Sequence, residues 1–198
     1  MSASRLKLSI LLTGIALNGA IFLGWTQEWI AVVLDDRTPL SVAGDVAAPA
    51  VSTLALSGLV LIGALAIAGP FFRVVLAIIE VLIGVAVVYS AVLAITGPAT
   101  ASAAAITTAT GVGGKESAAE LVATINPTIW PWITVIAGVL LMVVALSVLL
   151  TSRAWPGSSR KYQAVRLEQP DGGNSPTIER NAVDDWDALS SGDDPTGK

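Results

Sequence analysis

The chain has 198 residues, of which 54% are hydrophobic and only 13% are charged. Soluble domains carry about 25% charged residues, so a single membrane domain with a tail is the economical interpretation. The sequence has no cysteine and no histidine, which excludes disulfides and thiol catalysis and removes the commonest general base and metal ligand. We therefore expect no enzyme, no cofactor and no metal site, and the absence of a basic stripe argues against nucleic-acid binding.

Four continuous apolar runs are the main feature of the sequence, at residues 8–25, 47–68, 71–95 and 129–150. A bilayer core of about 30 Å needs about 20 apolar residues in a helix. Because the runs do not alternate between polar and apolar residues, they predict helices and not barrel strands. The expected fold class is an all-α membrane protein, with a four-helix transmembrane domain at residues 1–152 and a cytoplasmic, mostly disordered tail at 153–198.

The first run has one alternative interpretation, a signal peptide, because Arg5 and Lys7 precede it. The segment Trp25-Thr26-Gln27-Glu28-Trp29 follows, however, where a cleavage site needs small residues. The run is also long for a signal peptide. We therefore interpret it as a retained first helix.

Lysine and arginine predict the orientation in the membrane, since cytoplasmic loops carry an excess of both. With four spans, the seven basic residues near the helix ends fall on one side: Arg5, Lys7, Arg73, Arg153, Arg160, Lys161 and Arg166. The two other loops hold only Arg37 and Lys115. We expect a multi-pass plasma-membrane protein with both termini in the cytoplasm.

The two outer loops differ in character. In the first loop, two short β-prone runs at residues 29–34 and 40–44 flank a turn-rich segment, a pattern typical of a small extracellular hairpin. The second loop, residues 97–127, is rich in alanine, threonine, serine and glycine. We expect it to be a spacer with one short amphipathic helix over residues 115–125.

Five tryptophans fall at the expected membrane boundaries. Indole prefers the level of the lipid headgroups, so these residues predict interface anchors. They are Trp25, Trp29, Trp130 and Trp132 on the outer side and Trp155 on the inner side.

Glu80 is the most informative single residue, because only the third run contains charge, at Arg73 and Glu80. Glu80 lies nine residues past Phe71, about 14 Å along the helix and near the bilayer midplane. A carboxylate at that depth is expensive, so such residues face the bundle interior or water. The helical repeat places mostly small residues on the same face, which favours close helix packing: Arg73, Ala77, Glu80, Gly84 and Ala91.

Two polar residues of other helices match Glu80 in depth. Asn18 lies about 15 Å from the cytoplasmic end of the first helix and Ser57 about 16 to 17 Å from that of the second. We predict a buried cluster of the three with Glu80 in its neutral form. Its role is open between a packing device, a proton or solute site, and a lipid-facing position without function. Transporter folds usually show repeats and broken helices, which this sequence lacks.

The tail changes composition at about residue 167. Up to Arg166 it is basic, which suits anionic lipid at the cytoplasmic surface. Beyond Glu168 it is acidic and rich in proline, glycine, serine and aspartate, a composition that favours disorder. A tryptophan and a leucine within this segment indicate a docking motif for a protein partner, and a solvated tail is the alternative. The candidate residues are Asp185, Trp186, Leu189, Asp194 and Pro195.

Four short segments, in order along the chain, resemble one known family. They are Leu40–Gly44 followed by Ala48-Pro49-Ala50, then Trp130-Pro131-Trp132, then residues 153–162, and finally Asp185–Leu189 with residues 192–196. Together with four spans, they are similar to the tryptophan-associated (Trp-operon-associated) transmembrane proteins of actinobacteria. The resemblance implies a four-helix plasma-membrane protein encoded near tryptophan biosynthesis genes, and it implies no catalytic residue.

Three hypotheses for the function stay open. The first is an interaction or regulatory protein associated with tryptophan biosynthesis and acting through its tail. The second is a small transporter, or a transporter subunit, for tryptophan, indole or a precursor. The third is an accessory subunit of a larger envelope complex. Small residues such as Ala16, Ala20 and Gly24 permit helix association within or between chains, but nothing in the sequence supports a homo-oligomer.

Overall fold

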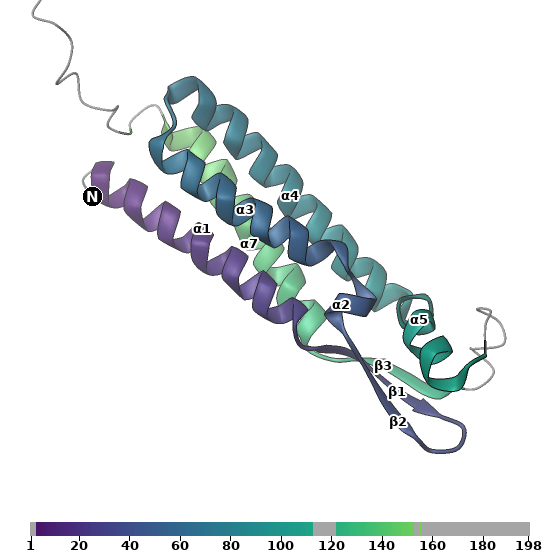
Figure 1. The fold of residues 1–198 in the computed structure, drawn as a ribbon. Coiled ribbons are helices and arrows are strands. Elements are labelled where there is room, and N and C mark those ends of the chain that lie inside the picture. Colours follow the sequence, from purple (N-terminus) through teal and green to yellow (C-terminus); the bar gives the residue numbers. More distant parts are fainter. Residues whose placement is uncertain (1–2, 113–121, 153–154, 156–198) are drawn as a thin grey trace, which may run out of the picture. The chain divides into compact units, whose positions relative to one another are not determined.

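The structure is a computed structural model that describes residues 3–112, 122–152 and 155. Its main feature is a bundle of four long helices (Figure 1). These are α1 (Ala3–Trp25), α3 (Ala50–Ile67), α4 (Pro70–Thr96) and α7 (Trp130–Thr151). All four are long and apolar enough to cross a membrane, so the prediction of four apolar helices of spanning length is confirmed.

The boundaries of the helices follow from glycine and proline. Pro70 begins α4 at a position where its missing N–H loses no helical hydrogen bond, and Pro131 lies in the first turn of α7 for the same reason. The second span begins at Ala50 rather than at the predicted residue 47, because residues Gly44–Ala47 form a separate short helix, α2, that ends before Pro49. The shortest span, α3, has 18 residues and reaches about 27 Å at 1.5 Å per residue.

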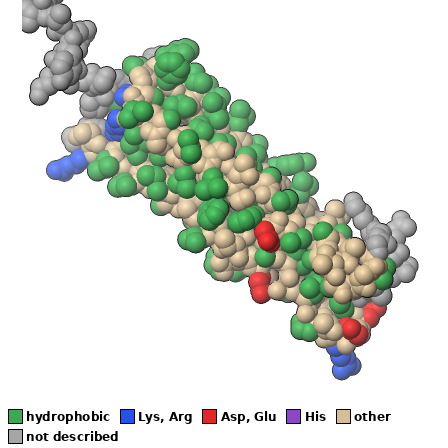
Figure 2. Space-filling view, viewed as in Figure 1, with side chains coloured by type: hydrophobic (Ala, Val, Ile, Leu, Met, Phe, Trp, Pro, Cys, Tyr) green, Lys and Arg blue, Asp and Glu red, His purple; other side chains and the backbone are tan. Residues whose placement is uncertain are grey.

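The four long helices pack as a ring. The neighbouring pairs are α1 with α3, α3 with α4, α4 with α7, and α7 with α1. Helices α1 and α4 therefore occupy opposite corners of the bundle. Figure 2 shows hydrophobic side chains along the length of the bundle, with lysine and arginine near the N-terminal end and acidic side chains, together with a further basic side chain, toward the sheet end. A surface of this kind is what a lipid environment requires and what water disfavours.

Helices α4 and α7 approach most closely at a pair of glycines. A Cβ atom on Gly84 would lie 2.6 Å from Met142 Cγ and 3.2 Å from the carbonyl oxygen of Gly138. A Cβ atom on Gly138 would lie 2.8 Å from Val88 Cγ2. Small residues allow backbones to approach in lipid, where van der Waals packing replaces the hydrophobic effect between helices.

A three-stranded antiparallel sheet lies at the end of the bundle away from the N-terminus (Figure 1). Strands β1 (Glu28–Leu34) and β2 (Pro39–Ala43) form the predicted hairpin, which is thereby confirmed. Strand β3 (Val122–Pro127) pairs with the other edge of β1, giving the order β2-β1-β3.

The hairpin loop is a tight connection of three residues, 35–37, because the N–H of Leu34 donates to the Thr38 carbonyl oxygen at 3.0 Å and so closes the loop. The N–H of Arg37 donates to the Leu34 carbonyl at 2.9 Å, and Arg37 adopts a left-handed conformation with φ of 66°, which is the usual geometry of a three-residue hairpin loop. The backbone N–H of Thr38 donates to Asp36 Oδ1 at 2.9 Å, and this hydrogen bond lowers the pKa of the exposed Asp36 carboxyl.

The second outer loop differs from its prediction. Residues 98–110, expected to be part of a spacer, form helix α5 (Pro98–Thr110). The helix predicted over residues 115–125 is wrong where the structure describes it, because Val122 to Ile125 belong to strand β3. Pairing with β1 determines that this segment is a strand. A long-range contact of that kind leaves no local periodicity in the sequence. Residues 113–121 lie outside the described part of the chain.

We predict that Gly84→Leu destabilises the bundle, because its side chain has no space between α4 and α7. Overpacking of this kind costs about 1–3 kcal/mol of unfolding free energy. The matched control is Gly63→Leu on α3, where a Cβ atom meets nothing within 4 Å. Thermal unfolding of the purified variants in one detergent measures both, and equal midpoints would contradict the close packing of α4 on α7.

Candidate functional site: a buried polar pair

Glu80 lies inside the bundle on α4, with 3% of its surface exposed. The other four residues predicted on its face, Arg73, Ala77, Gly84 and Ala91, are also buried. This face of α4 therefore packs against the other helices, while residues such as Phe72 and Leu82 face outward. The amphipathic arrangement is reversed relative to a soluble protein, with the charged side chains turned inward.

Asn18 of α1 is the polar partner of Glu80. It is fully buried, and its side-chain Nδ2 donates to Glu80 Oε1 at 2.9 Å. The same Nδ2 donates to the backbone carbonyl oxygen of Gly14 at 3.1 Å. Because α1 and α4 occupy opposite corners of the ring, the Asn18–Glu80 hydrogen bond crosses the interior of the bundle.

Ser57, the third residue predicted for this cluster, is not a partner of the pair. It is half-buried and makes no hydrogen bond to Asn18 or Glu80 within the described part of the chain. The residue of α3 that faces Asn18 is Gly58, where a Cβ atom would overlap the Asn18 side chain. Depth gives the position of Ser57 along the axis of α3. Successive residues of a helix are rotated by about 100° around that axis, so depth alone does not determine which residue of α3 faces inward.

Two oxygen atoms of the pair have no hydrogen-bond partner among the described residues. They are Asn18 Oδ1 and Glu80 Oε2, and both are buried. Buried polar atoms are hydrogen-bonded in the great majority of cases, so each exception calls for an explanation.

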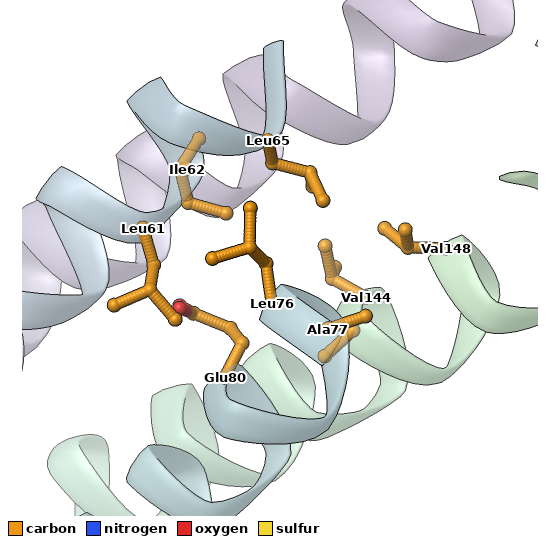
Figure 3. Close-up of a pocket in the computed structure, with 9 residues that line it drawn as sticks. Leu61, Ile62, Leu65, Leu76, Ala77, Glu80, Val144 and Val148 are labelled. Carbon is orange, nitrogen blue, oxygen red and sulfur yellow. The ribbon is translucent and has the colours of Figure 1, made fainter. Parts of the chain in front are cut away.

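A small cavity lies beside Glu80 (Figure 3). Its volume is about 10 Å³, the lower limit for a single water molecule. Glu80 is the one polar side chain in its lining, and the other eight side chains are apolar: Leu61, Ile62 and Leu65 of α3, Leu76 and Ala77 of α4, and Val144, Ala145 and Val148 of α7. Small-molecule sites usually measure about 300–1,000 Å³, so in this conformation the cavity holds no solute the size of indole.

A second cluster lies at the end of the bundle where α1 begins and α7 ends. Trp155 is 4% exposed, and two cations lie over its ring: Lys7 Nζ at 5.9 Å and Arg73 Cζ at 5.4 Å from the centroid. The indole N–H donates to Thr151 Oγ1 at 3.1 Å. Cation–π contacts at these distances are attractive and strengthen when desolvated. In the sequence, the one indication of this cluster is the presence of basic residues near three helix ends.

The backbone holds both cations in place as well. Lys7 Nζ donates to the Ala66 carbonyl oxygen at 2.7 Å, which joins α1 to the end of α3. Arg73 Nη1 donates to the Ser152 carbonyl oxygen at 3.4 Å, which joins α4 to the end of α7. The cluster therefore links all four long helices at this end.

The tryptophans predicted as interface anchors fall into two groups. Trp29 and Trp155 are enclosed by protein, and the Trp29 indole N–H donates to the Gly24 carbonyl oxygen at 2.7 Å. Trp132 is 52% exposed, and Trp25 and Trp130 are half-buried. Trp29 and Trp155 are thus packing residues of the two bundle ends, because a large aromatic ring at the end of a helix also fills the gap to its neighbours.

A shallow groove runs between α5 and the β1–β2 hairpin with α2. Its hollows have volumes of about 540, 460 and 360 Å³. The walls are mostly alanine, threonine and leucine, with Asp35 and Asp36 at the hairpin end. Both aspartates are exposed to solvent, so the groove has no desolvated charge that would select a ligand.

The remaining predicted site residues cannot be placed. Asp185, Trp186, Leu189, Asp194 and Pro195 lie outside the described residues. Within residues 3–112, 122–152 and 155, no group of three or more acidic side chains is arranged to hold a metal ion.

Comparison with known proteins gives one match. Residues 7–196 match the family described as tryptophan-associated transmembrane proteins, which covers nearly the whole chain. Searches of the curated proteins and of the solved structures found no match. The match extends across all four membrane-spanning helices and the sheet, and the chain therefore belongs to the tryptophan-associated transmembrane protein family.

Proposed function

We propose that this protein is a non-enzymatic membrane scaffold that presents its C-terminal segment, residues 156–198, to a protein partner associated with tryptophan biosynthesis. The observation that carries the proposal is the enclosure of Trp155, the residue from which that segment departs. Lys7 and Arg73 hold its ring from α1 and α4. Its indole N–H donates to Thr151 of α7, so the departure point of the segment is fixed relative to α1, α4 and α7.

The filled interior of the bundle favours a scaffold over a solute passage. The cavity at Glu80 measures about 10 Å³. Helices α4 and α7 are in close contact at Gly84 and Gly138, where a Cβ atom on Gly84 would lie 3.2 Å from the Gly138 carbonyl oxygen. Close helix contacts beside a cavity of this size support a bundle with a single stable arrangement.

The sequence of the segment suits a protein partner. Its first part contains Arg160, Lys161 and Arg166, which favour an anionic lipid surface. Its last part places Trp186 and Leu189 among aspartates. Tryptophan is enriched among residues that dominate binding energy, and acidic neighbours keep such a segment soluble when unbound.

We also propose that both termini face the cytoplasm and that the membrane is the plasma membrane. Lys7 and Arg73 lie at one end of the bundle, and the sheet end carries the acidic Glu28, Asp35, Asp36 and Asp45 with Arg37. An excess of lysine and arginine marks the cytoplasmic side.

Single cysteines test this orientation without background, because the chain has none. We expect a membrane-impermeant maleimide to label Ser41→Cys, on the exposed face of β2, in intact cells. Ser4→Cys, exposed at the start of α1, should be labelled only after permeabilisation. The reverse pattern would place the termini outside.

Affinity purification in mild detergent tests the scaffold itself. We expect the tagged full-length protein to recover a specific partner, and recovery to fall at least tenfold in a chain truncated after Arg166 and in the Trp186→Ala/Leu189→Ala double variant. Ser190→Ala/Ser191→Ala is the matched control in the same segment and should recover the partner normally. Equal recovery by the truncated chain would refute docking through the segment and favour an accessory subunit held through the helices.

Transport of tryptophan, indole or a precursor is the second candidate, and the buried Glu80 with its adjoining cavity favours it. In this case Glu80→Gln should change uptake or efflux of the labelled compound by at least several-fold at unchanged protein level. Deletion of the whole protein should have the same effect. Rates unaltered in both strains would remove this candidate.

A further inference from the structure

We propose that Glu80 and Asn18 form an intramembrane proton-binding site, an acid–amide pair in which Glu80 Oε2 carries a proton and donates it to Asn18 Oδ1. The ligand of the site is a single proton, bound at the level where α1 and α4 meet across the bundle. The inference goes beyond the scaffold function and does not depend on it.

The count of donors and acceptors carries the proposal. A side-chain amide has two N–H donors and one oxygen acceptor. Asn18 Nδ2 already donates to Glu80 Oε1 and to the Gly14 carbonyl oxygen, so both of its hydrogens are used. What remains is one oxygen on each side chain, Asn18 Oδ1 and Glu80 Oε2, both buried and without a partner.

Only the neutral form of Glu80 can satisfy both oxygens. An ionised carboxylate is an acceptor and has no hydrogen to give, so it leaves two buried acceptors unsatisfied. A protonated carboxyl supplies the missing donor. The existing Nδ2–Oε1 hydrogen bond already holds the amide and the carboxyl group in direct contact, and Asn18 Oδ1 is the buried acceptor of the pair that still lacks a donor. One proton therefore completes the pair.

The cavity beside Glu80 has no other polar or charged side chain in its lining. The lining includes Leu61, Ile62 and Leu65 of α3 and Val144, Ala145 and Val148 of α7. The nearest charged side chain on its own helix is Arg73, seven residues away and about 10 Å along the axis. Arg73 is engaged with Trp155 and Ser152 at the end of the bundle. An uncompensated charge buried in this way would strongly destabilise the bundle.

Water cannot take the place of the proton. A buried water needs two to four polar partners. The adjoining cavity has only Glu80 as a polar lining residue and measures about 10 Å³. On the other side of the pair, Gly58 of α3 packs directly against the Asn18 amide.

Infrared spectroscopy of the reconstituted full-length protein at neutral pH tests the proposal. We expect a carboxylic-acid C=O band that is absent from Glu80→Gln. The matched control is Glu28→Gln, since Glu28 is exposed on β1, and the band should remain in this variant. A spectrum of the wild type without the band, or a band that persists in Glu80→Gln, would overturn the proposal.

A second variant tests the pairing. Asn18→Leu removes the N–H that Glu80 Oε1 accepts, and a C=O group that loses a hydrogen bond absorbs at higher frequency. We therefore expect the Glu80 band to shift upward in Asn18→Leu, and an unshifted band would refute the acid–amide pair. If either variant fails to fold, the wild type labelled with ¹³C-carboxyl glutamate replaces it. A carboxylic-acid C=O band at neutral pH that shifts with the label supports the site, and the absence of such a band refutes it.

Discussion

One hydrogen bond, from Asn18 to Glu80, sets the constraint on which the bundle is built. It joins helices at opposite corners, so it forms only if α3 and α7 leave room on both sides. Gly58 provides that room on α3, and the Gly84–Gly138 contact draws α7 against α4. The hydrocarbon region of a bilayer holds no water that could form hydrogen bonds to the pair. The pair is therefore stable only if the surrounding helices pack closely enough to enclose it. The glycines and the polar pair are therefore parts of one arrangement.

The two ends of the bundle are closed by different means, each using a tryptophan. At the sheet end, Trp29 is fully buried, and its indole packs against Gly44, where a Cβ atom would lie 2.8 Å from Nε1. The indole N–H donates to the Gly24 carbonyl oxygen of α1 at 2.7 Å, which secures the sheet to the end of that helix. At the other end, Trp155 lies under two cations and joins the helices through charge and carbonyl contacts. A cation over a ring remains attractive at a wet interface, which suits an end that meets the headgroups.

The sequence predicted the features that depend on composition and local pattern. The four spans follow from continuous apolar runs, the hairpin from two short β-prone runs around a turn, and the inward face of α4 from the spacing of Arg73, Ala77 and Glu80. It failed where the outcome depends on long-range partners. Strand β3 forms because β1 offers a free edge. Gly58 and not Ser57 faces Asn18, because depth along the helix carries no information about rotation around its axis. The burial of Trp29 and Trp155 likewise depends on neighbours that composition does not show.

The buried face of α4 connects the centre of the bundle to its end. Arg73 and Glu80 lie two turns apart on this face, one engaged with Trp155 and Ser152, the other with Asn18. An α-helix is rigid over two turns, so a rotation or shift of α4 that separates Glu80 from Asn18 also moves Arg73 relative to Trp155. The C-terminal segment departs next to that ring. A change at the Asn18–Glu80 pair and a change at the Trp155 cluster are therefore linked through one helix.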